Sequence, residues 1–381
     1  MTKHDLSIAM NGSMLDEKPT GVGVYSFNLI NNLFRLYGKD SGKRLTVFSP
    51  TYQQLNKDLK VVKLPALLQS SKYGKTAAFC RFLWNTFSYP LQAWGYDLLI
   101  SPTTHGSFLL KNQVITIHDL LSLRYKNISA HQRFYFKYLL PFLVSRAKLV
   151  LTVSETTRQD IIRLLKCPEE KVKVVYNGYD RSQYYSKEEK EQLFFQEYGF
   201  RNYLLAVGPT YPHKNLEMLL LAYQEMDPAI RSRHPLVIAG GKKEYIHYLK
   251  RRTRELQLEE EVHFAGYIPL RLMPSLYREA YALVFPSLYE GFGIPLLEAM
   301  ACGCPVAVSR ASSMPEVCED AALYFDPMDQ VSIRTAIERL ISDKMTYSQL
   351  REKGLIQVQK FSWEKTALEV KTLLDNHFSI N

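Results

Sequence analysis

The stretch from Val284 to Glu316 constrains the fold more than any other, because strand, glycine and helix signals follow one another closely in it. It reads VFPSLYEGFGIPLLEAMACGCPVAVSRASSMPE. Pro286 ends the short apolar run at its start. Glycines on both sides of Phe292 allow the backbone to expose its N–H groups, and Pro295 suits the first turn of a helix. The stretch therefore predicts a strand, a loop and a helix whose N-terminus can hold an anion.

Two carboxylates bracket the glycine loop, Glu290 just before it and Glu298 within the predicted helix. A carboxylate accepts hydrogen bonds from two neighbouring hydroxyls, so the pair suits a polyol that lies beside a phosphate. The alternative is that Glu290 is solvated and Glu298 only stabilises its helix. The loop between the two carboxylates favours the binding site.

The segment Glu290-Gly-Phe-Gly-Ile-Pro-Leu-Leu-Glu298 resembles the E-x7-E signature of the family-4 retaining glycosyltransferases. The resemblance implies the GT-B fold, an α/β architecture of two facing Rossmann-like domains with a cleft between them. It also implies that Glu298 binds the ribose diol of a sugar nucleotide and that Glu290 and the loop meet the transferred sugar. The loop residues that it assigns to the donor are Gly291, Phe292, Gly293 and Ile294.

Length and composition agree with two soluble domains. The chain has 381 residues, too many for one ordinary core, and an apolar fraction of 46%. We expect no transmembrane helix, because no run of 18 apolar residues exists, and no signal peptide. Five scattered cysteines indicate reduced thiols in the cytoplasm. Cys302 and Cys304 lack the partners of a metal site, so no metal is expected.

The positive charge is concentrated in the first half. Residues 1–185 hold 25 Lys and Arg against 12 Asp and Glu, a net charge of +13, and the remainder carries −3. An acidic partner is therefore expected: a membrane surface, nucleic acid or a phosphorylated acceptor. The aromatic and basic segment Lys72–Trp94 suits a membrane interface on the inner face of the cell membrane, or equally a core-packing helix with one solvated edge.

Gly21 and Gly23 follow a predicted strand, Leu6–Met10, and precede a predicted helix over Val24–Tyr37. A strand, a G-x-G sequence and a helix make up half of the glycine-rich motif by which Rossmann domains bind dinucleotides. Ser26 stands where the third glycine belongs, which disfavours a hydride-transferring dehydrogenase. The family resemblance instead makes the two glycines a close-approach loop that faces the donor diphosphate or the acceptor.

His118 and Asp119 follow the predicted strand Val114–Ile117, at the end where open α/β sheets bind ligands. A lone histidine is most often structural. In the family that this chain resembles, however, a His-Asp pair at this position reaches the donor sugar, so we favour a functional His118.

The second half begins again with a strand, Tyr203–Val207, and the loop from Gly208 to Asn215. Lys214, just before a helix, is placed to neutralise phosphate. Family members carry an Arg-Lys-Asn sequence in this loop, so the resemblance implies that Gly208, His213, Lys214 and Asn215 contact the diphosphate, with His213 in place of the arginine. It also places Tyr267 in a loop along the nucleotide base.

These observations predict an acceptor-binding domain over residues 1–185 and a nucleotide-sugar domain over 186–361, with residues 362–381 packing back on the first. The resemblance implies retaining hexosyl transfer without a metal, catalysed by His118, Glu290 and Lys214. It implies attack by an acceptor hydroxyl on the face that the phosphate leaves, and proton uptake by that phosphate.

The loop after Ile117 and the segment His213–Asn215 most resemble those of bacterial polysaccharide mannosyltransferases. The resemblance implies GDP-mannose as the donor, with a UDP-sugar as the alternative, no further cofactor, and a saccharide or lipid-linked acceptor. A GT-B sugar-nucleotide epimerase or phosphorylase is the other enzyme class. A nucleic-acid-binding protein is the non-enzyme alternative, but the sequence has no helix-turn-helix, zinc or RNA-binding signature.

Overall fold

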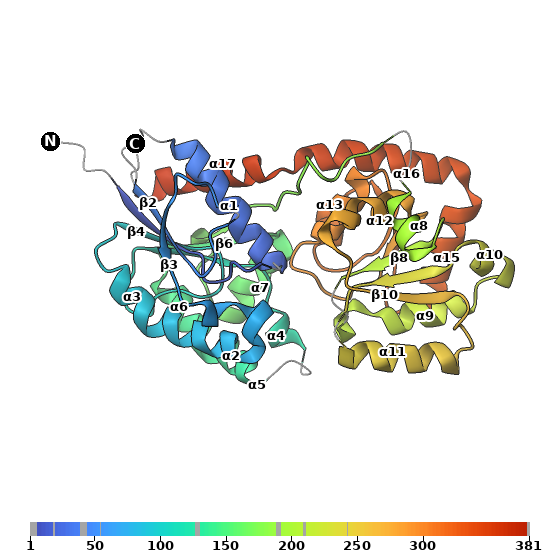
Figure 1. The fold of residues 1–381 in the computed structure, drawn as a ribbon, viewed down its shortest axis with the longest axis horizontal. Coiled ribbons are helices and arrows are strands. Elements are labelled where there is room, and N and C mark those ends of the chain that lie inside the picture. The colour runs from blue at the N-terminus through green and yellow to red at the C-terminus, as the bar shows by residue number, and fades with distance from the viewer. Residues whose placement is uncertain are drawn as a thin grey trace. The chain divides into compact units, whose positions relative to one another are not determined.

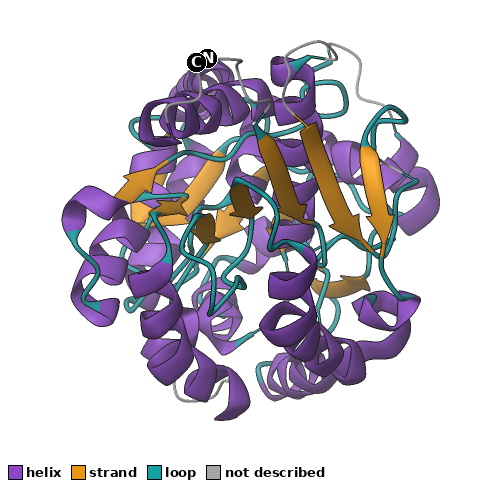
Figure 2. Cartoon of the chain, turned by 90° about the vertical axis from the view of Figure 1, so that its left-hand side faces the viewer, coloured by secondary structure: helices purple, strands orange, loops and turns teal. Residues whose placement is uncertain are grey.

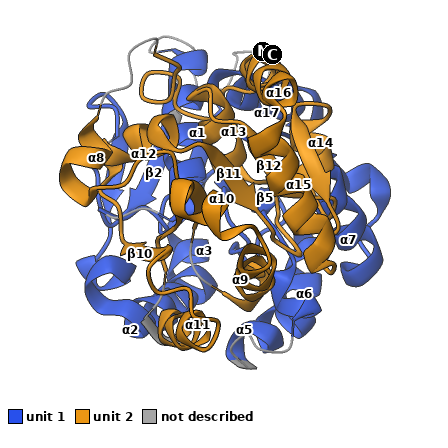
Figure 3. Ribbon diagram, turned by 90° about the vertical axis from the view of Figure 1, so that its right-hand side faces the viewer, with its two compact units in different colours: residues 1–178, 363–381 blue, residues 179–362 orange. Residues whose placement is uncertain are grey.

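The chain folds into two compact units, each built on its own parallel sheet (Figure 3). The computed structural model describes residues 6–17, 20–38, 44–53, 55–125, 130–187, 192–208, 211–241 and 243–378. Unit 1 comprises residues 1–178 and 363–381, and unit 2 comprises residues 179–362. The predicted linker stretch 187–192 lies mostly outside the described residues.

The sheet of unit 1 has seven parallel strands in the order β3-β2-β1-β4-β5-β6-β7 and forms a central layer between helices (Figure 2). Its central strands are buried along their length, as expected for a parallel sheet covered on both faces. The strands are β1 (Ser7–Asn11), β2 (Arg44–Ser49), β3 (Lys60–Lys63), β4 (Leu98–Ser101), β5 (Gln113–Ile117), β6 (Leu149–Thr152) and β7 (Val172–Val174).

The helices of unit 1 include the last one of the chain, which packs against the first (Figure 1). They are α1 (Gly21–Tyr37), η1 (Ala66–Leu68), α2 (Ser70–Leu83), η2 (Trp84–Ser88), α3 (Tyr89–Gln92), α4 (Leu121–Arg124), α5 (Ala130–Phe134), η3 (Tyr135–Leu139), α6 (Leu140–Arg146), α7 (Glu155–Leu165), η4 (Glu169–Lys171) and α17 (Trp363–Phe378). Among the described residues, no helix has both the length and the apolar character that crossing a membrane requires.

Two wide π-turns, η2 and η3, lie just ahead of prolines. From the sequence, a helix is expected over His131–Ser145 that Pro141 breaks. This expectation is wrong at Pro141, because helical backbone continues through the proline. Leu140 donates its backbone N–H to Tyr135, five residues back, which widens the turn before Pro141. A proline cannot donate to the carbonyl four residues back and its ring crowds that carbonyl, so a wider turn accommodates it.

The segment Lys72–Trp94 is helical as far as Gln92 and has an exposed apolar side, but one of its three interleaved basic residues, Lys72, Lys75 and Arg81, is buried. The Arg81 side chain is 8% exposed and donates from Nη1 to the Leu68 carbonyl at 2.5 Å. Sequence alone grouped Arg81 with Lys72 and Lys75, because a single basic residue gives no sign of the face on which it lies.

The sheet of unit 2 has six parallel strands in the order β10-β9-β8-β11-β12-β13. They are β8 (Leu204–Val207), β9 (Leu236–Ala239), β10 (Val262–Gly266), β11 (Ala282–Phe285), β12 (Val306–Ser309) and β13 (Ala322–Phe325). The helices of the unit are α8 (Leu193–Tyr198), η5 (Pro212–Lys214), α9 (Leu216–Gln224), α10 (Pro228–Arg233), α11 (Lys243–Glu255), η6 (Leu270–Leu272), α12 (Met273–Glu279), α13 (Ile294–Ala301), α14 (Met314–Cys318), α15 (Gln330–Ser342), α16 (Lys344–Gln357) and η7 (Val358–Lys360).

One apolar core joins this sheet to the helices. Leu204 and Ile238 on the strands pack with Leu219 and Tyr223 of α9 and with Ile337 of α15, all of them almost completely buried. Burying side chains of this size supplies the main stabilising free energy of such a core. The core thereby fixes β8 next to β11, although the two strands are far apart in the sequence.

Candidate active site

The strand order of unit 2 reverses between β8 and β11, and the loops after these two strands meet at that point. Ligands of open α/β sheets bind at such switch points, beyond the carboxyl ends of the strands. Lys214 follows β8 and Glu290 follows β11. Lys214 Nζ and Glu290 Oε1 lie 2.5 Å apart, with side chains that are 11% and 15% exposed. The structure thus brings together two predicted catalytic residues as an ion pair that solvent screens only weakly.

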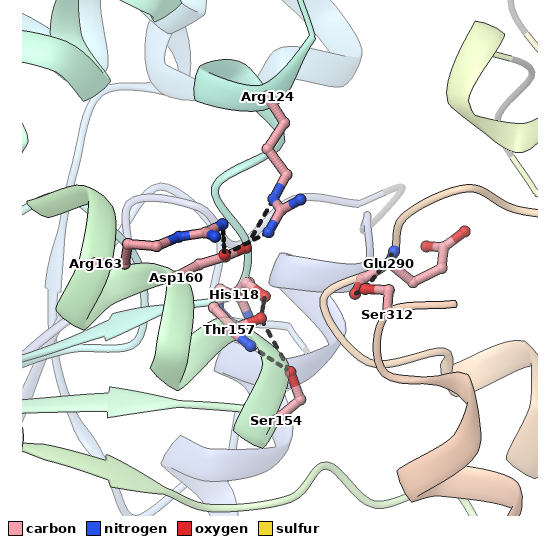
Figure 4. Close-up of polar contacts among 8 residues, drawn as sticks. All are labelled: His118, Arg124, Ser154, Thr157, Asp160, Arg163, Glu290 and Ser312. Atoms are coloured by element: carbon pink, nitrogen blue, oxygen red, sulfur yellow. Dashed lines mark hydrogen bonds and ion pairs between the residues drawn. The ribbon is translucent and has the colours of Figure 1, made fainter. Parts of the chain in front are cut away.

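The backbone of the glycine loop is held by two serines before α14. The Glu290 N–H donates to Ser312 Oγ at 3.2 Å, and Ser312 Oγ donates to the Glu290 carbonyl at 2.7 Å (Figure 4). Ser313 Oγ lies 3.0 Å from the Glu290 carbonyl and 2.8 Å from the Phe292 carbonyl. No local sequence pattern marks these serines, because their partners are more than twenty residues away in the chain.

Two glycines shape the loops on either side of the pair. Gly293, the residue before α13, takes φ of +115°, which L side chains rarely adopt. Gly240 also has positive φ, and a Cβ there would lie 2.6 Å from the Gly208 carbonyl oxygen. Gly240 therefore allows the backbone after β9 to touch the backbone after β8, the strand that leads to Lys214.

Glu298, on α13, lies against two tyrosines. The Tyr277 hydroxyl donates to Oε2 at 2.8 Å, and the Tyr184 hydroxyl also bonds this carboxyl. Burial raises the pKa of Glu298 to about 7, while the two tyrosine hydrogen bonds oppose the rise and the charge of Asp180 adds to it. A carboxyl that titrates near neutral pH accepts ligand hydroxyls best when it is ionised.

The other predicted donor residues of unit 2 differ in their surroundings. His213 is buried against Tyr211, with ring centroids 5.6 Å apart, and burial followed by the charge of Lys214 lowers its pKa to about 4. Asn215 Nδ2 donates to the Pro327 carbonyl at 2.7 Å, which holds the loop after β8 to the loop after β13. Tyr267 is 64% exposed.

In unit 1, His118 follows β5 and is fixed by its neighbours. Its Nε2 lies 3.0 Å from the Pro102 carbonyl oxygen. Because a carbonyl only accepts, Nε2 carries the proton and Nδ1 keeps a lone pair. Tyr25 packs edge-on against the ring at a centroid distance of 4.7 Å. Burial lowers the pKa of His118 to about 4, so at neutral pH the ring is an uncharged hydrogen-bond acceptor at Nδ1.

The helices around His118 are held by side-chain contacts that Figure 4 shows. Thr157, in the first turn of α7, donates from its hydroxyl to the His118 carbonyl at 3.4 Å, and Ser154 caps the same helix through the Thr157 N–H. Arg124, at the end of α4, donates to both carboxyl oxygens of Asp160 on α7, at 2.9 Å and 2.5 Å.

Gly21 and Gly23 lie inside α1 and not in a loop before it. The prediction that this helix begins at Val24 is wrong, because the Val24 N–H already donates to the Thr20 carbonyl at 2.9 Å. Glycine is a poor helix former, so the sequence signal favoured a loop. In a first turn, however, its N–H group needs no partner within the helix and can face a ligand.

Comparison with known proteins identifies the class to which this geometry belongs. Residues 19–183 match the model described as Glycosyltransferase Family 4, and residues 187–356 match Glycosyl transferases group 1. The fold is GT-B, with two Rossmann-like domains: the chain superimposes on HepE of Anabaena, solved with UDP and glucose, with a TM-score of 0.74 over 97% of this chain and all of that one, at 19% identity.

Two curated relatives cover nearly the full length. The O-antigen chain mannosyltransferase RfbU of Salmonella typhimurium is 33% identical over 87% of this chain and 90% of its own length. The O-antigen chain mannosyltransferase B of Escherichia coli is 31% identical over 91% and 93%. The chain therefore belongs to the family-4 glycosyltransferases.

The surroundings of His118 predict that its imidazole stays neutral, with the proton on Nε2, from pH 8 down to about pH 5. Nitrogen NMR of the uniformly labelled protein checks this, with the resonances assigned by their loss in His118→Gln. The two ring nitrogens should keep separate, pH-independent shifts over that range. A titration with a midpoint near 6.5 would contradict the burial described above.

Proposed function

We propose that the protein transfers mannose from a sugar nucleotide, GDP-mannose first, to a saccharide acceptor in polysaccharide synthesis, with retention of configuration at the anomeric carbon. The Lys214–Glu290 pair at the switch point of unit 2 is the observation that carries the proposal, because it joins a phosphate-binding cation to a sugar-binding carboxylate. The mannosyltransferase names of the two full-length relatives support the choice of sugar. A UDP-sugar donor is the alternative.

In this proposal unit 2 binds the nucleotide sugar and unit 1 the acceptor. Glu298 accepts hydrogen bonds from the two ribose hydroxyls, and Tyr277 and Tyr184 hold its carboxyl in place. The backbone of the loop from Gly291 to Ile294 meets the transferred sugar. Tyr267 covers the base with an exposed ring, and His213 and Asn215 shape the diphosphate loop after Gly208.

Glu298→Gln should weaken nucleoside diphosphate binding by roughly ten- to a hundredfold at pH 8, since a charged acceptor of two hydroxyls is lost. In the wild type the affinity should also rise as the pH passes upward through about 7, because binding needs the ionised carboxyl. Calorimetric titration with GDP and UDP from pH 5.5 to 8.5 measures both effects.

The matched comparison is Tyr277→Phe, which removes one hydrogen bond to the ionised form and should move the same pH transition upward. The glutamine variant should show no transition attributable to this group. An affinity that is equal in wild type and Glu298→Gln at every pH would remove Glu298 from the binding site.

Lys214 forms an ion pair with Glu290, so a donor diphosphate must take the place of Glu290 as the partner of Lys214. The exchange releases the Glu290 carboxylate, which can then accept a hydroxyl of the transferred sugar. Both groups therefore change partners as the donor binds. Lys214 then balances the charge that develops on the leaving diphosphate, a task that other enzymes of phosphate esters assign to a metal ion.

Glu290→Gln should bind the nucleoside diphosphate about three- to tenfold more tightly than the wild type, yet transfer the sugar more slowly, and Lys214→Met should bind it at least tenfold more weakly. Affinity for the nucleoside without phosphates should not change. Glu261→Gln is the matched control, because Glu261 forms a similarly covered ion pair with Arg231, at 3.4 Å. Unchanged diphosphate affinity in Glu290→Gln would exclude the exchange.

Transfer without a divalent metal is part of the same proposal, so activity should persist in excess EDTA. Loss of activity on chelation, restored by Mg²⁺ or Mn²⁺, would contradict it.

His118 takes part as a neutral hydrogen-bond acceptor: Nδ1 can hold a sugar hydroxyl, but the ring does not supply a proton at neutral pH. The acceptor hydroxyl gives its proton to the departing phosphate.

We also infer that unit 1 works at an anionic membrane surface, on the inner face of the cell membrane. Phe79, Phe87, Leu91 and Trp94 are 61% to 71% exposed, and Leu83 continues the four-residue spacing of this apolar side of α2 to α3. Exposed aromatic residues beside cations such as Lys75 suit a lipid surface. The positive net charge of residues 1–185 also favours binding to an anionic membrane surface.

Flotation with vesicles tests the membrane proposal. The protein should float with anionic but not with neutral vesicles, and 1 M salt should release it, because the Debye length falls from about 8 Å to about 3 Å. Phe87→Ser with Leu91→Ser should float less, whereas Ile356→Ser, an equally exposed site in unit 2, should behave as wild type. Equal recovery with both vesicle types would reject the proposal.

A further inference from the structure

Unit 1 contains a pocket of about 540 Å³ that no part of the proposed donor site uses. Its walls come from α4, from α5 with the π-turn η3, and from α7. The side chains that matter are of two kinds. Arg133, Lys137 and Ser122 are polar, and Leu123, Phe136 and Leu164 are apolar.

The electrostatics of the pocket favour an anion. Arg133 and Lys137 are exposed cations four residues apart, and no carboxylate stands among the described residues that line the pocket. The Lys137 ammonium lies over the ring of Tyr138, another lining residue, 5.0 Å from its centroid. Two cations on one wall and the Ser122 hydroxyl on another can share the oxygens of a phosphate.

The floor of the pocket favours an apolar group attached to that anion. Leu123 and Phe136 pack against the apolar core of unit 1, and Leu164 stays 38% exposed. Phe134 and Tyr138, whose rings contact each other at 5.1 Å, extend the apolar wall to the surface with more than half of each side chain exposed. A free inorganic anion would leave all of this apolar surface in water.

The pocket is fixed, and it adjoins the predicted acceptor end of the sheet. Ser122 and Leu123 follow His118 by only a few residues, at the carboxyl end of β5. The double hydrogen bond from Arg124 to Asp160 joins α4 to α7, and Asp160 is nearly fully buried (Figure 4). Two of the helices that line the pocket are therefore held together.

We propose that this pocket binds the phosphate and the first apolar segment of a lipid carrier to which the saccharide acceptor is attached. Arg133, Lys137 and Ser122 hold the phosphate, and the chain passes over Leu123, Phe136 and Leu164 toward the exposed rings of Phe134 and Tyr138. The inference rests on the proposed function and names the chemistry by which unit 1 recognises its acceptor: an apolar alcohol esterified to phosphate.

The test is calorimetric titration of the full chain with farnesyl phosphate, compared with farnesol and with inorganic phosphate. Farnesyl phosphate should bind at least tenfold more tightly than either fragment, because only farnesyl phosphate contacts both the cations and the apolar surface of the pocket. Arg133→Gln with Lys137→Gln should weaken its binding at least tenfold. Lys60→Gln with Lys111→Gln is the matched control, because it removes the same charge at exposed sites near the amino ends of β3 and β5 and should leave the affinity unchanged.

Leu164→Trp separates a pocket from a charged surface. It keeps both cations and fills the apolar part, so farnesyl phosphate should again bind at least tenfold more weakly. Unchanged binding in Leu164→Trp, or equal loss in the two charge-removing double variants, would overturn the proposal. Phosphatidylglycerol in micelles that displaces farnesyl phosphate at equal concentration would also overturn it, in favour of a general lipid-headgroup site.

Failure of this inference and failure of the proposed function are distinguishable. Nucleoside diphosphate affinity depends on unit 2, and a free saccharide has no lipid phosphate for the pocket to hold, so nucleotide affinity and transfer to a free saccharide should both be unchanged in the Arg133 and Lys137 variants. A protein that binds nucleotide normally but does not discriminate farnesyl phosphate from its fragments would keep the proposed function and lose only the lipid-phosphate pocket.

Discussion

The pairing of β8 with β11 is the constraint on which the candidate donor site depends. Backbone hydrogen bonds set Leu204 beside Ala282, and the apolar core beneath keeps the two strands in register. The contact between Lys214 and Glu290 follows from this pairing, because the loops that carry them leave the same edge of the sheet. Lys214 and Glu290 can then approach within 2.5 Å, although 75 residues lie between them in the chain.

In the proposed function, the charged groups at this edge of the sheet change their ion-pair and hydrogen-bond partners when the donor binds. Glu290 is paired with Lys214, and burial raises the pKa of Glu298 to about 7, so neither carboxylate is a fully solvated anion. In this proposal, a sugar nucleotide offers hydroxyls to the two carboxylates and a diphosphate to the lysine. The Lys214–Glu290 pair keeps both charges partnered within the unit, which avoids the cost of burying an unpaired charge.

The sequence predicted the GT-B fold, the family and the strand–loop–helix units around Glu290 and Lys214, because these depend on local patterns of glycine, proline and apolar residues. It did not predict the partners that hold them. Tyr277 and Ser312 reach Glu298 and Glu290 across gaps in the chain that no local pattern spans. The error at Pro141 and the unpredicted burial of Arg81 have the same origin: tertiary packing decides whether a helix accommodates a proline and which of its faces is buried.

Unit 1 is discontinuous in sequence, and this has a consequence for its synthesis. Its last helix, α17, begins at Trp363, whose ring lies 6.1 Å from the Tyr25 ring that in turn packs on His118. A ribosome makes the sheet of unit 1 before the whole of unit 2, and α17 after it. The surroundings of His118 are thus complete only after unit 2 has been synthesised, whereas unit 2, continuous from residue 179 to 362, has all its parts earlier.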